Sequence, residues 1–183
     1  STKQAALRTA KVDVMDGVSL VDAGQIRTTT PQLKELQYPG PHMTGIGMRI
    51  DKPPFNDVRV RKALIMDTDF KSIMQGLFGG RGWYLTWPSE FHRGYEAAYL
   101  SLDDPDCPAI VKELYTYNPD KARQLLKDAG YPNGFKTSVL VQNTDREGVD
   151  YFSIIKDQWS KVGVNLDITV KEVAAVTSLK TDY

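Results

Sequence analysis

The sequence lacks the features that define several classes of protein. It has one cysteine, Cys107, and two histidines, which excludes an internal disulfide and the common cysteine–histidine zinc sites. Its 23 basic and 23 acidic side chains leave no net charge, and no block of like charges would attract nucleic acid or an anionic membrane surface. Its longest apolar runs, such as residues 63–66 and 173–176, are far shorter than a membrane-spanning helix. The sequence therefore predicts no nucleic-acid partner and no membrane span.

What is present is an ordinary globular composition. The chain has 183 residues, of which 41% are hydrophobic and 10% are aromatic. A chain of this length forms one domain or at most two small ones, and this much apolar residue with zero net charge is not typical of intrinsic disorder. We therefore expect a stable hydrophobic core.

The clearest local signal is a capped helix in the C-terminal half. Asn118 is a residue type that caps helix N-termini, and Pro119 suits the first helical position. Apolar residues then recur at helical spacing until Gly130, which stands where a helix of this length ends. The pattern predicts a helix over residues 118–129.

A strand, a helix and a second strand follow this helix. Residues 135–142 and 164–170 alternate between apolar and polar side chains, which is the period of a half-buried strand. Between them, residues 146–162 carry an apolar stripe at helical spacing that Gly163 ends. Short links between these elements predict a βαβ unit with parallel strands.

The N-terminal half is less clearly patterned. Residues 44–50 are typical of a strand, which the proline pair at 53–54 ends because proline cannot donate to a strand ladder. Asn56 or Asp57 can cap a helix that runs to about residue 66, and further helices are predicted over residues 70–78 and, amphipathic, over 172–183. Together with the βαβ unit, these elements predict the α/β class, with a mixed sheet and flanking helices.

Residues 81–117 show neither the helical nor the strand period. Long segments without a period inside a compact domain are usually functional or disordered, and the aromatic content of this one argues against disorder. Aromatic rings that alternate with guanidinium groups suit a small organic ligand with a carboxylate, although the rings could instead pack the segment onto the sheet. The candidate ligand contacts in this segment are Arg81, Trp83, Tyr84, Trp87 and Arg93.

Catalytic motifs occur only as partial matches. Residues 153–156 read S-x-x-K, as in penicillin-binding enzymes, but the companion motifs are missing or in reversed order. Glu90 and His92 could relay a proton, yet nothing nearby supplies a nucleophile or an oxyanion site. The glycines of residues 76–82 follow a predicted helix, whereas a phosphate-binding loop precedes one. The sequence therefore predicts a protein that is not an enzyme and has no cofactor and no metal site.

Three motifs resemble those of one protein family. Residues 52–64 read KPPFNDVRVRKAL and are followed by Asp69, similar to the family pattern PPFxDxRVRxAL…D. Residues 117–135 read YNPDKARQLLKDAGYPNGF, similar to YxPxKAxxLLxxAGYPxGF. Residues 155–164 read IKDQWSKVGV, similar to IQxxWxKxGV. On these motifs, in this order and near this spacing, the chain resembles the family 5 extracellular solute-binding proteins, the peptide- and nickel-type receptors of ABC importers.

The resemblance implies one lobe of a periplasmic-binding-protein type II fold, in which a cleft between two lobes holds the ligand. Residues 1–183 would form a single, partial lobe of a longer receptor, and the irregular region 81–117 would face the ligand. In dipeptide-binding members, an arginine near the start of the helix before the third motif holds the ligand carboxylate. Arg146 lies in that region here, and Val149 and Asp150 lie closer to that position.

The resemblance also implies a function. We expect the substrate-binding component of an ABC transporter, a monomer that binds an oligopeptide or a similar small solute and delivers it to a membrane permease. It would work in the periplasm or on the extracellular face of the cytoplasmic membrane, with Arg146 and the candidate residues of segment 81–93 contacting the ligand. The alternative is a ligand-sensing domain of a transcriptional regulator, and a hydrolase has little support. The ligand stays open among peptides, nickel chelates, oligosaccharides and opine-like compounds.

Overall fold

The structure is a computed structural model that describes residues 2–36, 45–80 and 100–181. The chain divides into two compact units, Ser1–Pro39 and Gly40–Tyr183, called unit 1 and unit 2 here. Each unit is described by itself. That both belong to one partial lobe of a larger protein stays a prediction.

Unit 1 contains two helices, α1 (Thr2–Arg8) and α2 (Leu20–Thr29). Helix α2 begins at Ser19, whose hydroxyl oxygen accepts a hydrogen bond from the backbone N–H of Asp22 at 3.1 Å. The buried side chains described in this unit are polar, Gln4 and Thr30, whereas Val14 and Val21 are largely exposed. Unit 1 therefore has little hydrophobic core of its own.

Unit 2 is built on the predicted βαβ unit, which the structure confirms. Strands β1 (Phe135–Gln142) and β2 (Val164–Lys171) pair in parallel, with Phe135 opposite Val164 and Gln142 opposite Lys171. Helix α7 (Arg146–Ser160) connects the two strands. The strands form a two-stranded sheet, which is the only sheet in the described residues.

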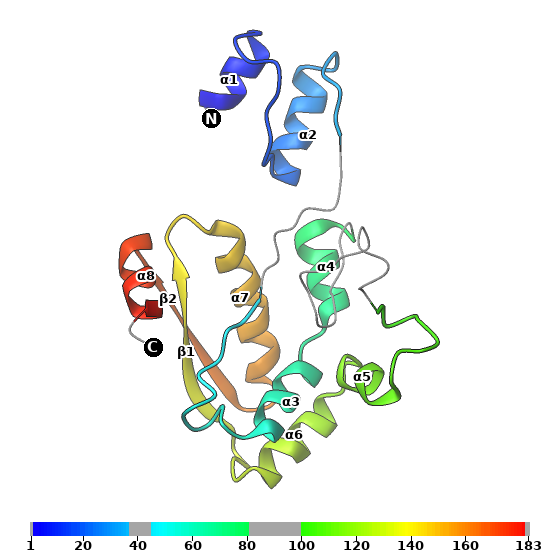
Figure 1. Cartoon of the computed structure of the whole chain (residues 1–183), viewed down its shortest axis with the longest axis vertical. Helices are drawn as coiled ribbons and strands as arrows, with labels where there is room; N and C mark the ends of the chain where they lie inside the picture. The colour runs from blue at the N-terminus through cyan, green and yellow to red at the C-terminus, as the bar shows by residue number, and fades with distance from the viewer. Residues whose placement is uncertain (1, 37–44, 81–99, 182–183) are drawn as a thin grey trace. The chain divides into compact units, whose positions relative to one another are not determined.

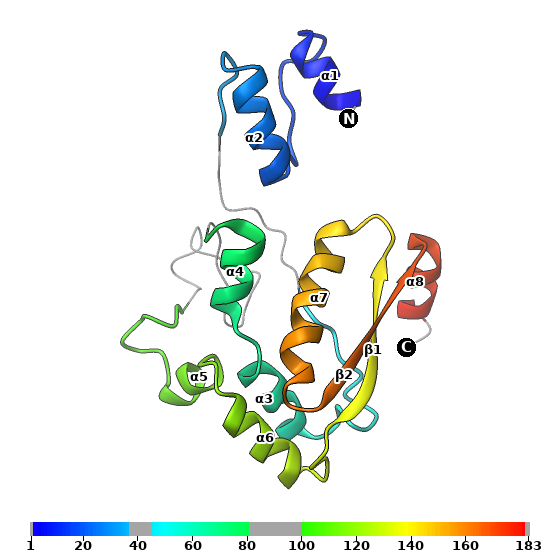
Figure 2. The same ribbon diagram turned by 180° about the vertical axis from the view of Figure 1, so that it is seen from behind.

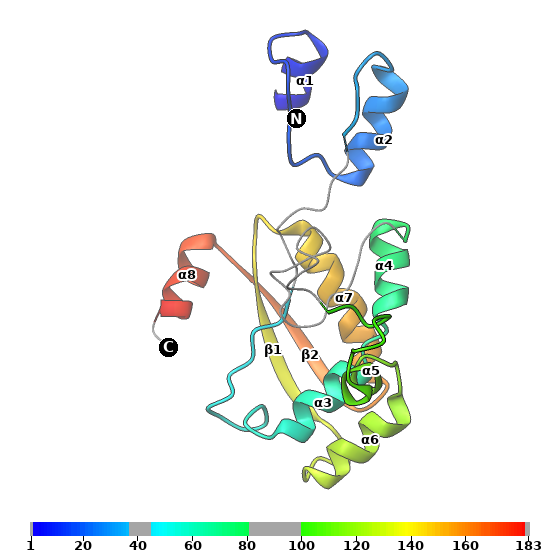
Figure 3. The same ribbon diagram turned by 45° about the vertical axis from the view of Figure 1, so that its right-hand side comes forward.

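The sheet lies between helices on both sides (Figures 1 and 3). Helix α8 (Val173–Thr181) contacts β1 on one side, and α7 contacts β2 on the other. Beyond α7 lie α3 (Val58–Met66) and α4 (Phe70–Phe78), followed by α5 (Ala109–Leu114) and α6 (Pro119–Asp128) (Figure 2). Helix α3 packs on α6, and α4 packs on α7.

One hydrophobic cluster joins these elements. Burial of each large apolar side chain contributes about 1.5–3 kcal/mol, so the cluster is the main source of stability. Its buried members come from helices α3, α4, α6 and α7, from both strands and from Val162 in the turn before β2, and include Leu64, Ile73, Leu126, Ile155, Trp159 and Val164.

The residues at the helix borders determine where the helices begin and end. The Asn118 side chain accepts a hydrogen bond from the backbone N–H of Lys121 at 3.0 Å, and Pro119 occupies the first turn, as predicted. The side chain of Asp57 caps α3 in the same way, through the Arg59 N–H at 2.8 Å. Gly79 ends α4 in the left-handed conformation, with φ of 57°. These local signals account for the borders of the predicted helices.

The strand predicted over residues 44–50 does not form in the described part of this segment. Among the described residues, 45–50 pair with no strand, although Ile46 and Met48 are half-buried against the core and Gly45 and Gly47 are exposed. Alternation decides which side chains turn inward, whereas a strand ladder also needs a neighbouring strand with free backbone groups. The described sheet is therefore two parallel strands and not the expected mixed sheet.

Part of the region 81–117, which was predicted to be irregular, is helical. Helix α5 lies within it, and the backbone N–H groups of Val111 and Lys112 donate to the Pro108 carbonyl at 2.9 and 3.2 Å. Pro108 makes no side-chain cap, and the helix has six residues, too few for the helical period to be recognised. Residues 81–99 lie outside the described residues.

Candidate ligand-binding site

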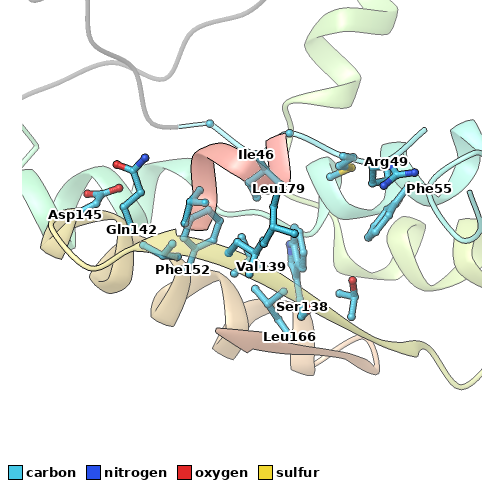
Figure 4. Close-up of a pocket in the computed structure, with 18 residues that line it drawn as sticks. Ile46, Arg49, Phe55, Ser138, Val139, Gln142, Asp145, Phe152, Leu166 and Leu179 are labelled. Atoms are coloured by element: carbon cyan, nitrogen blue, oxygen red, sulfur yellow. The ribbon is translucent and has the colours of Figure 1, made fainter. Parts of the chain in front are cut away.

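A cavity of about 670 Å³ lies in unit 2 between β1, the segment 45–49 and α8 (Figure 4). Its walls come from parts of the chain that are far apart in the sequence. The apolar side chains that line it include Ile46, Met48, Phe55, Val139, Phe152 and Leu179. A volume of this size matches the range of small-molecule sites.

Strand β1 and the segment 45–49 form two opposite walls of this cavity. Every residue of β1 from 137 to 142 lines it, so the strand presents both an apolar face and its edge. In the described residues, β1 pairs with β2 alone, which leaves its other edge beside the cavity. The segment 45–49 closes the space from the opposite side, and its apolar side chains there, Ile46 and Met48, are half-buried.

Polar groups lie at the rim of the cavity. Arg49 donates two hydrogen bonds to Asp51, from Nε to Oδ1 at 2.8 Å and from Nη2 to Oδ2 at 2.7 Å. These bonds lower the pKa of the Asp51 carboxyl from 3.8 to about 2. Gln142 and Asp145 lie at the carboxyl end of β1. In parallel α/β sheets, this end is where ligands usually bind.

The link between β1 and α7 is fixed by a tight helix cap. The Asp145 Oδ1 atom accepts a hydrogen bond from the backbone N–H of Gly148 at 2.8 Å. A Cβ atom at position 148 would lie 2.2 Å from Asp145 Oδ2, so a larger residue there would displace the capping carboxylate. The Asn143 N–H donates to the Lys171 carbonyl at 2.8 Å, which holds the link against the end of β2. The cap therefore sets where α7 begins.

Arg146, one of the predicted ligand contacts, is the first residue of α7. Its side chain is exposed and has no hydrogen bond or ion pair with the described residues. A cation at a helix N-terminus is disfavoured by the helix dipole, so the fold gains no stability from this charge at this place. Arg146 is therefore available to an anionic group.

The other predicted contacts, Arg81, Trp83, Tyr84, Trp87 and Arg93, lie outside the described residues. The described chain before them ends at Gly80, directly after α4. Helices α4 and α7 run antiparallel: Asp69, before α4, binds Gln158 near the end of α7, and Gly76 faces Ile154 farther along. The end of α4 therefore lies at the same end of unit 2 as Arg146 (Figures 1 and 2).

Sequence reasoning missed the cavity itself. Its lining residues are scattered over segments 45–55, 137–166 and 176–179, and only the fold brings them together. The D-x-x-G pattern of residues 145–148 was the one local signal, because an aspartate three residues before glycine fits a tight cap. In the described ranges, no group of three acidic, histidine or cysteine side chains could hold a metal ion.

The chain is similar to parts of several known proteins. The structure of HbpA2 from Haemophilus parasuis is 30% identical to this chain, with a TM-score of 0.70, and the match covers 99% of this chain and 34% of that one. Heme-binding protein A of Haemophilus influenzae is 28% identical over 183 residues, 95% of this chain and 30% of its own length. A glutathione-binding protein, GsiB of Pectobacterium atrosepticum, is 27% identical over 127 residues, 69% of this chain and 22% of its own length.

These similarities define the chain as part of a solute-binding protein. The sequence profile of the bacterial extracellular solute-binding proteins, family 5 (middle region), matches residues 1–183, so the chain belongs to this family. Members of the family bind solutes and are not enzymes. The chain spans about a third of the length of HbpA2 and of heme-binding protein A. None of the helices in the described ranges has both the length and the apolar character that a membrane crossing requires.

Proposed function

We propose that the full-length protein is the substrate-binding component of an ABC importer. It binds a small solute or peptide in the periplasm, or on the extracellular face of the cytoplasmic membrane, and delivers it to the permease. The observation that carries this proposal is the family match over residues 1–183, because a match along the whole chain includes the segments between the scaffold motifs.

The ligand is proposed to carry a carboxylate that Arg146 binds. Arg146 is exposed, has no partner in the described residues and lies at the carboxyl end of the sheet. Guanidinium groups bind carboxylates through two parallel hydrogen bonds. Two relatives have names that state their ligands, heme and glutathione, and both of these compounds carry carboxylates. The apolar cavity beside β1 supports a ligand that also has an apolar part.

The aromatic segment is proposed to cover the apolar part of the ligand. Trp83, Tyr84 and Trp87 would stack on it, and Arg81 and Arg93 would contact further acidic groups. The segment follows α4 directly, and α4 ends at the end of unit 2 where α7 begins. Ligand binding would stabilise the closed arrangement of two lobes, which the permease then recognises in a monomeric receptor.

The first test measures binding by the full-length protein. Thermal shift and calorimetry are run with hemin, glutathione, short peptides and opine-type compounds, for the natural protein, Arg146→Gln and Lys156→Gln. A ligand at about 100 times its dissociation constant stabilises the native protein by about 2.7 kcal/mol. Loss of a charge-assisted bond costs about 1.5–3 kcal/mol, so R146Q should weaken binding about 10- to 100-fold.

Lys156 is the matched control for this test. It is exposed on the same helix, ten residues farther along, which is about 15 Å from Arg146. Binding should be unchanged in K156Q. If R146Q binds every ligand as well as K156Q does, Arg146 is not a ligand contact.

The second test addresses the rings. Trp83→Ala and Trp87→Ala should lose the ligand-induced shift while the unliganded protein keeps its melting temperature. Variants that melt lower without ligand would show that the rings belong to the core. If no compound binds the natural protein, the alternative of a sensor domain gains support, and a DNA-binding module in the full-length chain would identify it.

A further inference from the structure

The junction between α3 and α4, residues 66–69, is held by hydrogen bonds to two other helices. The Met66 carbonyl accepts from the backbone N–H of Asn118 at 2.7 Å, which ties the junction to the start of α6. The Thr68 hydroxyl oxygen accepts from the Trp159 Nε1–H at 3.1 Å, and its proton goes to the Leu64 carbonyl at 2.7 Å. The junction is therefore anchored on α6 and α7.

Asp67 lies inside this junction, and its side chain has no hydrogen-bond partner in the described residues. The residue as a whole is 0% exposed, and neither of its carboxyl oxygens has a hydrogen-bond partner in the described part of the chain. It is the cap residue at the C-terminus of α3, where the helix dipole disfavours a negative charge. An ionised carboxylate in this position would lose its hydration and gain no hydrogen bond in return.

The cations nearest to Asp67 do not replace that hydration. Arg123 on α6 and Lys161 at the end of α7 lower the pKa of Asp67, but each does so by less than burial raises it. Arg123 is paired with Asp120 at 2.5 Å, and Lys161 is paired with Asp157 at 2.9 Å. Burial is the largest influence, and it raises the pKa of Asp67 from 3.8 to about 7.

Several other charged groups on the packed elements have partners elsewhere. On α3, Arg59 binds Asp57 and the Asp128 carbonyl, and Arg61 binds the Phe55 carbonyl. Asp69 caps α4 through the Ser72 N–H. Tyr117 acts on Lys161, and on α5 Lys112 binds the Asp104 carbonyl and Glu113 pairs with Lys121. Lys62 on α3 and Lys71 on α4 are further cations on these helices.

We propose that Asp67 is a pH-sensitive switch of the fold: it is protonated in the packed junction, and its ionisation loosens the contact of the α3–α4 junction with α6 and α7. The two oxygens without partners and the complete burial of the residue carry this proposal. It concerns the stability of unit 2 and is independent of the ligand.

The direction of the effect follows from proton linkage. The carboxyl group binds its proton more tightly in the folded chain than in the unfolded chain, so the unfolded chain loses its proton at lower pH. The stability contributed by the protonated group is complete below the unfolded value of 3.8 and is lost as pH rises through about 7. From about pH 5 to about pH 8, this one group should increase the unfolding equilibrium constant about 100-fold.

The test is urea unfolding of the full chain between about pH 5 and about pH 8. All three tryptophans, Trp83, Trp87 and Trp159, belong to unit 2, so their fluorescence reports its unfolding. The natural protein is compared with Asp67→Asn, which cannot ionise, and with Asp103→Asn, which changes an exposed aspartate. Between these pH values, the unfolding equilibrium constant of the natural protein and of D103N should rise about 100-fold more than that of D67N. Equal pH dependence in all three proteins would overturn the proposal.

A second measurement needs no variant. In the natural protein labelled with ¹³C-aspartate, the carboxyl carbon of Asp67 is assigned through its backbone and titrated. A midpoint near pH 7 supports the switch. A midpoint near 4, the ordinary value for aspartate, overturns it, even if D67N does not fold.

Discussion

Gln158 joins two helices through both ends of its side-chain amide. It is 6% exposed, and its Oε1 atom accepts from the backbone N–H of Asp69 at 3.0 Å. Its Nε2 atom donates to the Ser72 hydroxyl at 3.0 Å. At the scale of the single residue, α4 is thus held on α7 by a buried polar group as well as by apolar packing.

Replacement of this amide by an apolar side chain should destabilise the protein. In Gln158→Leu, the Asp69 N–H loses its acceptor, which costs about 1–3 kcal/mol. Gln124→Leu on the exposed side of α6 is the matched control and should change stability by less than about 0.5 kcal/mol. Urea unfolding measures both. Equal stabilities of the two variants would mean that the buried amide contributes nothing.

Single-residue roles were predictable from the sequence where the partner is a near neighbour. Asn118 caps a helix through a residue three positions later, and the residue types at the helix start indicate that. Gln158 binds a residue 89 positions away, and no local pattern distinguishes it from a surface glutamine. Arg146 was proposed as a ligand contact from a family pattern. That the Asp67 carboxyl group is buried without a hydrogen-bond partner could be seen only in the structure.

At the scale of elements, the two strands begin at a contact between two glycines. A Cβ atom on Gly134 would lie 2.0 Å from the Gly163 carbonyl oxygen, and one on Gly163 would lie 2.8 Å from the Asn133 carbonyl oxygen. Both glycines have positive φ, 72° and 89°. This contact brings the starts of β1 and β2 into register, because Phe135 and Val164 follow directly and pair.

Alanine substitutions at these glycines should show how much stability is lost through the steric clash and how much through the positive φ. Gly130→Ala is the control, because Gly130 has φ of 92°, close to that of Gly163, and a Cβ atom there would meet nothing within 4 Å. G130A should cost about 1–2 kcal/mol from the positive φ alone. G163A should cost at least about 1 kcal/mol more, and G134A more still.

Thermal and urea unfolding measure these costs, and circular dichroism checks that each variant keeps its fold. If G130A and G163A are equally destabilised, the backbone conformation alone matters and the contact between the strands adds nothing. The ranking therefore tests the geometry of the parallel pair.

Elements were predictable where one pattern extends over enough residues. The βαβ unit follows from periods that run through β1, α7 and β2. The prediction of a strand at 44–50 was wrong because a strand needs a partner strand from another part of the chain, and none pairs with residues 45–50 in the described structure. Helix α5 is too short to show a period, and α2 carries threonine and glycine where a stripe of apolar residues would mark a helix.

At the scale of the whole molecule, the core belongs to unit 2. Every residue of the hydrophobic cluster lies between positions 46 and 168, and none of the described residues of unit 1 contributes to it. The cavity is lined only by residues of unit 2 as well. Its lining could not be predicted, because it depends on the assembled fold and not on any one segment.

Removal of unit 1 should therefore leave unit 2 folded. A chain of residues 40–183 should keep the melting temperature of the tryptophan-detected transition within about 4 °C of the full chain, which corresponds to about 1 kcal/mol. Differential scanning fluorimetry measures it. Loss of cooperative unfolding would show that unit 1 supplies stability that its own few buried side chains do not explain.

The anchoring of the α3–α4 junction also has a consequence for synthesis on the ribosome. Thr68 and Asp69 find their partners on α7, 91 and 89 residues later in the chain. At about 5–20 residues per second, translation of that distance takes on the order of 5–20 s. Helix α3 can pack on α6 before this time has passed, whereas α4 packs on α7 and cannot be fixed in place, so its apolar face stays open to chaperones until Trp159 emerges.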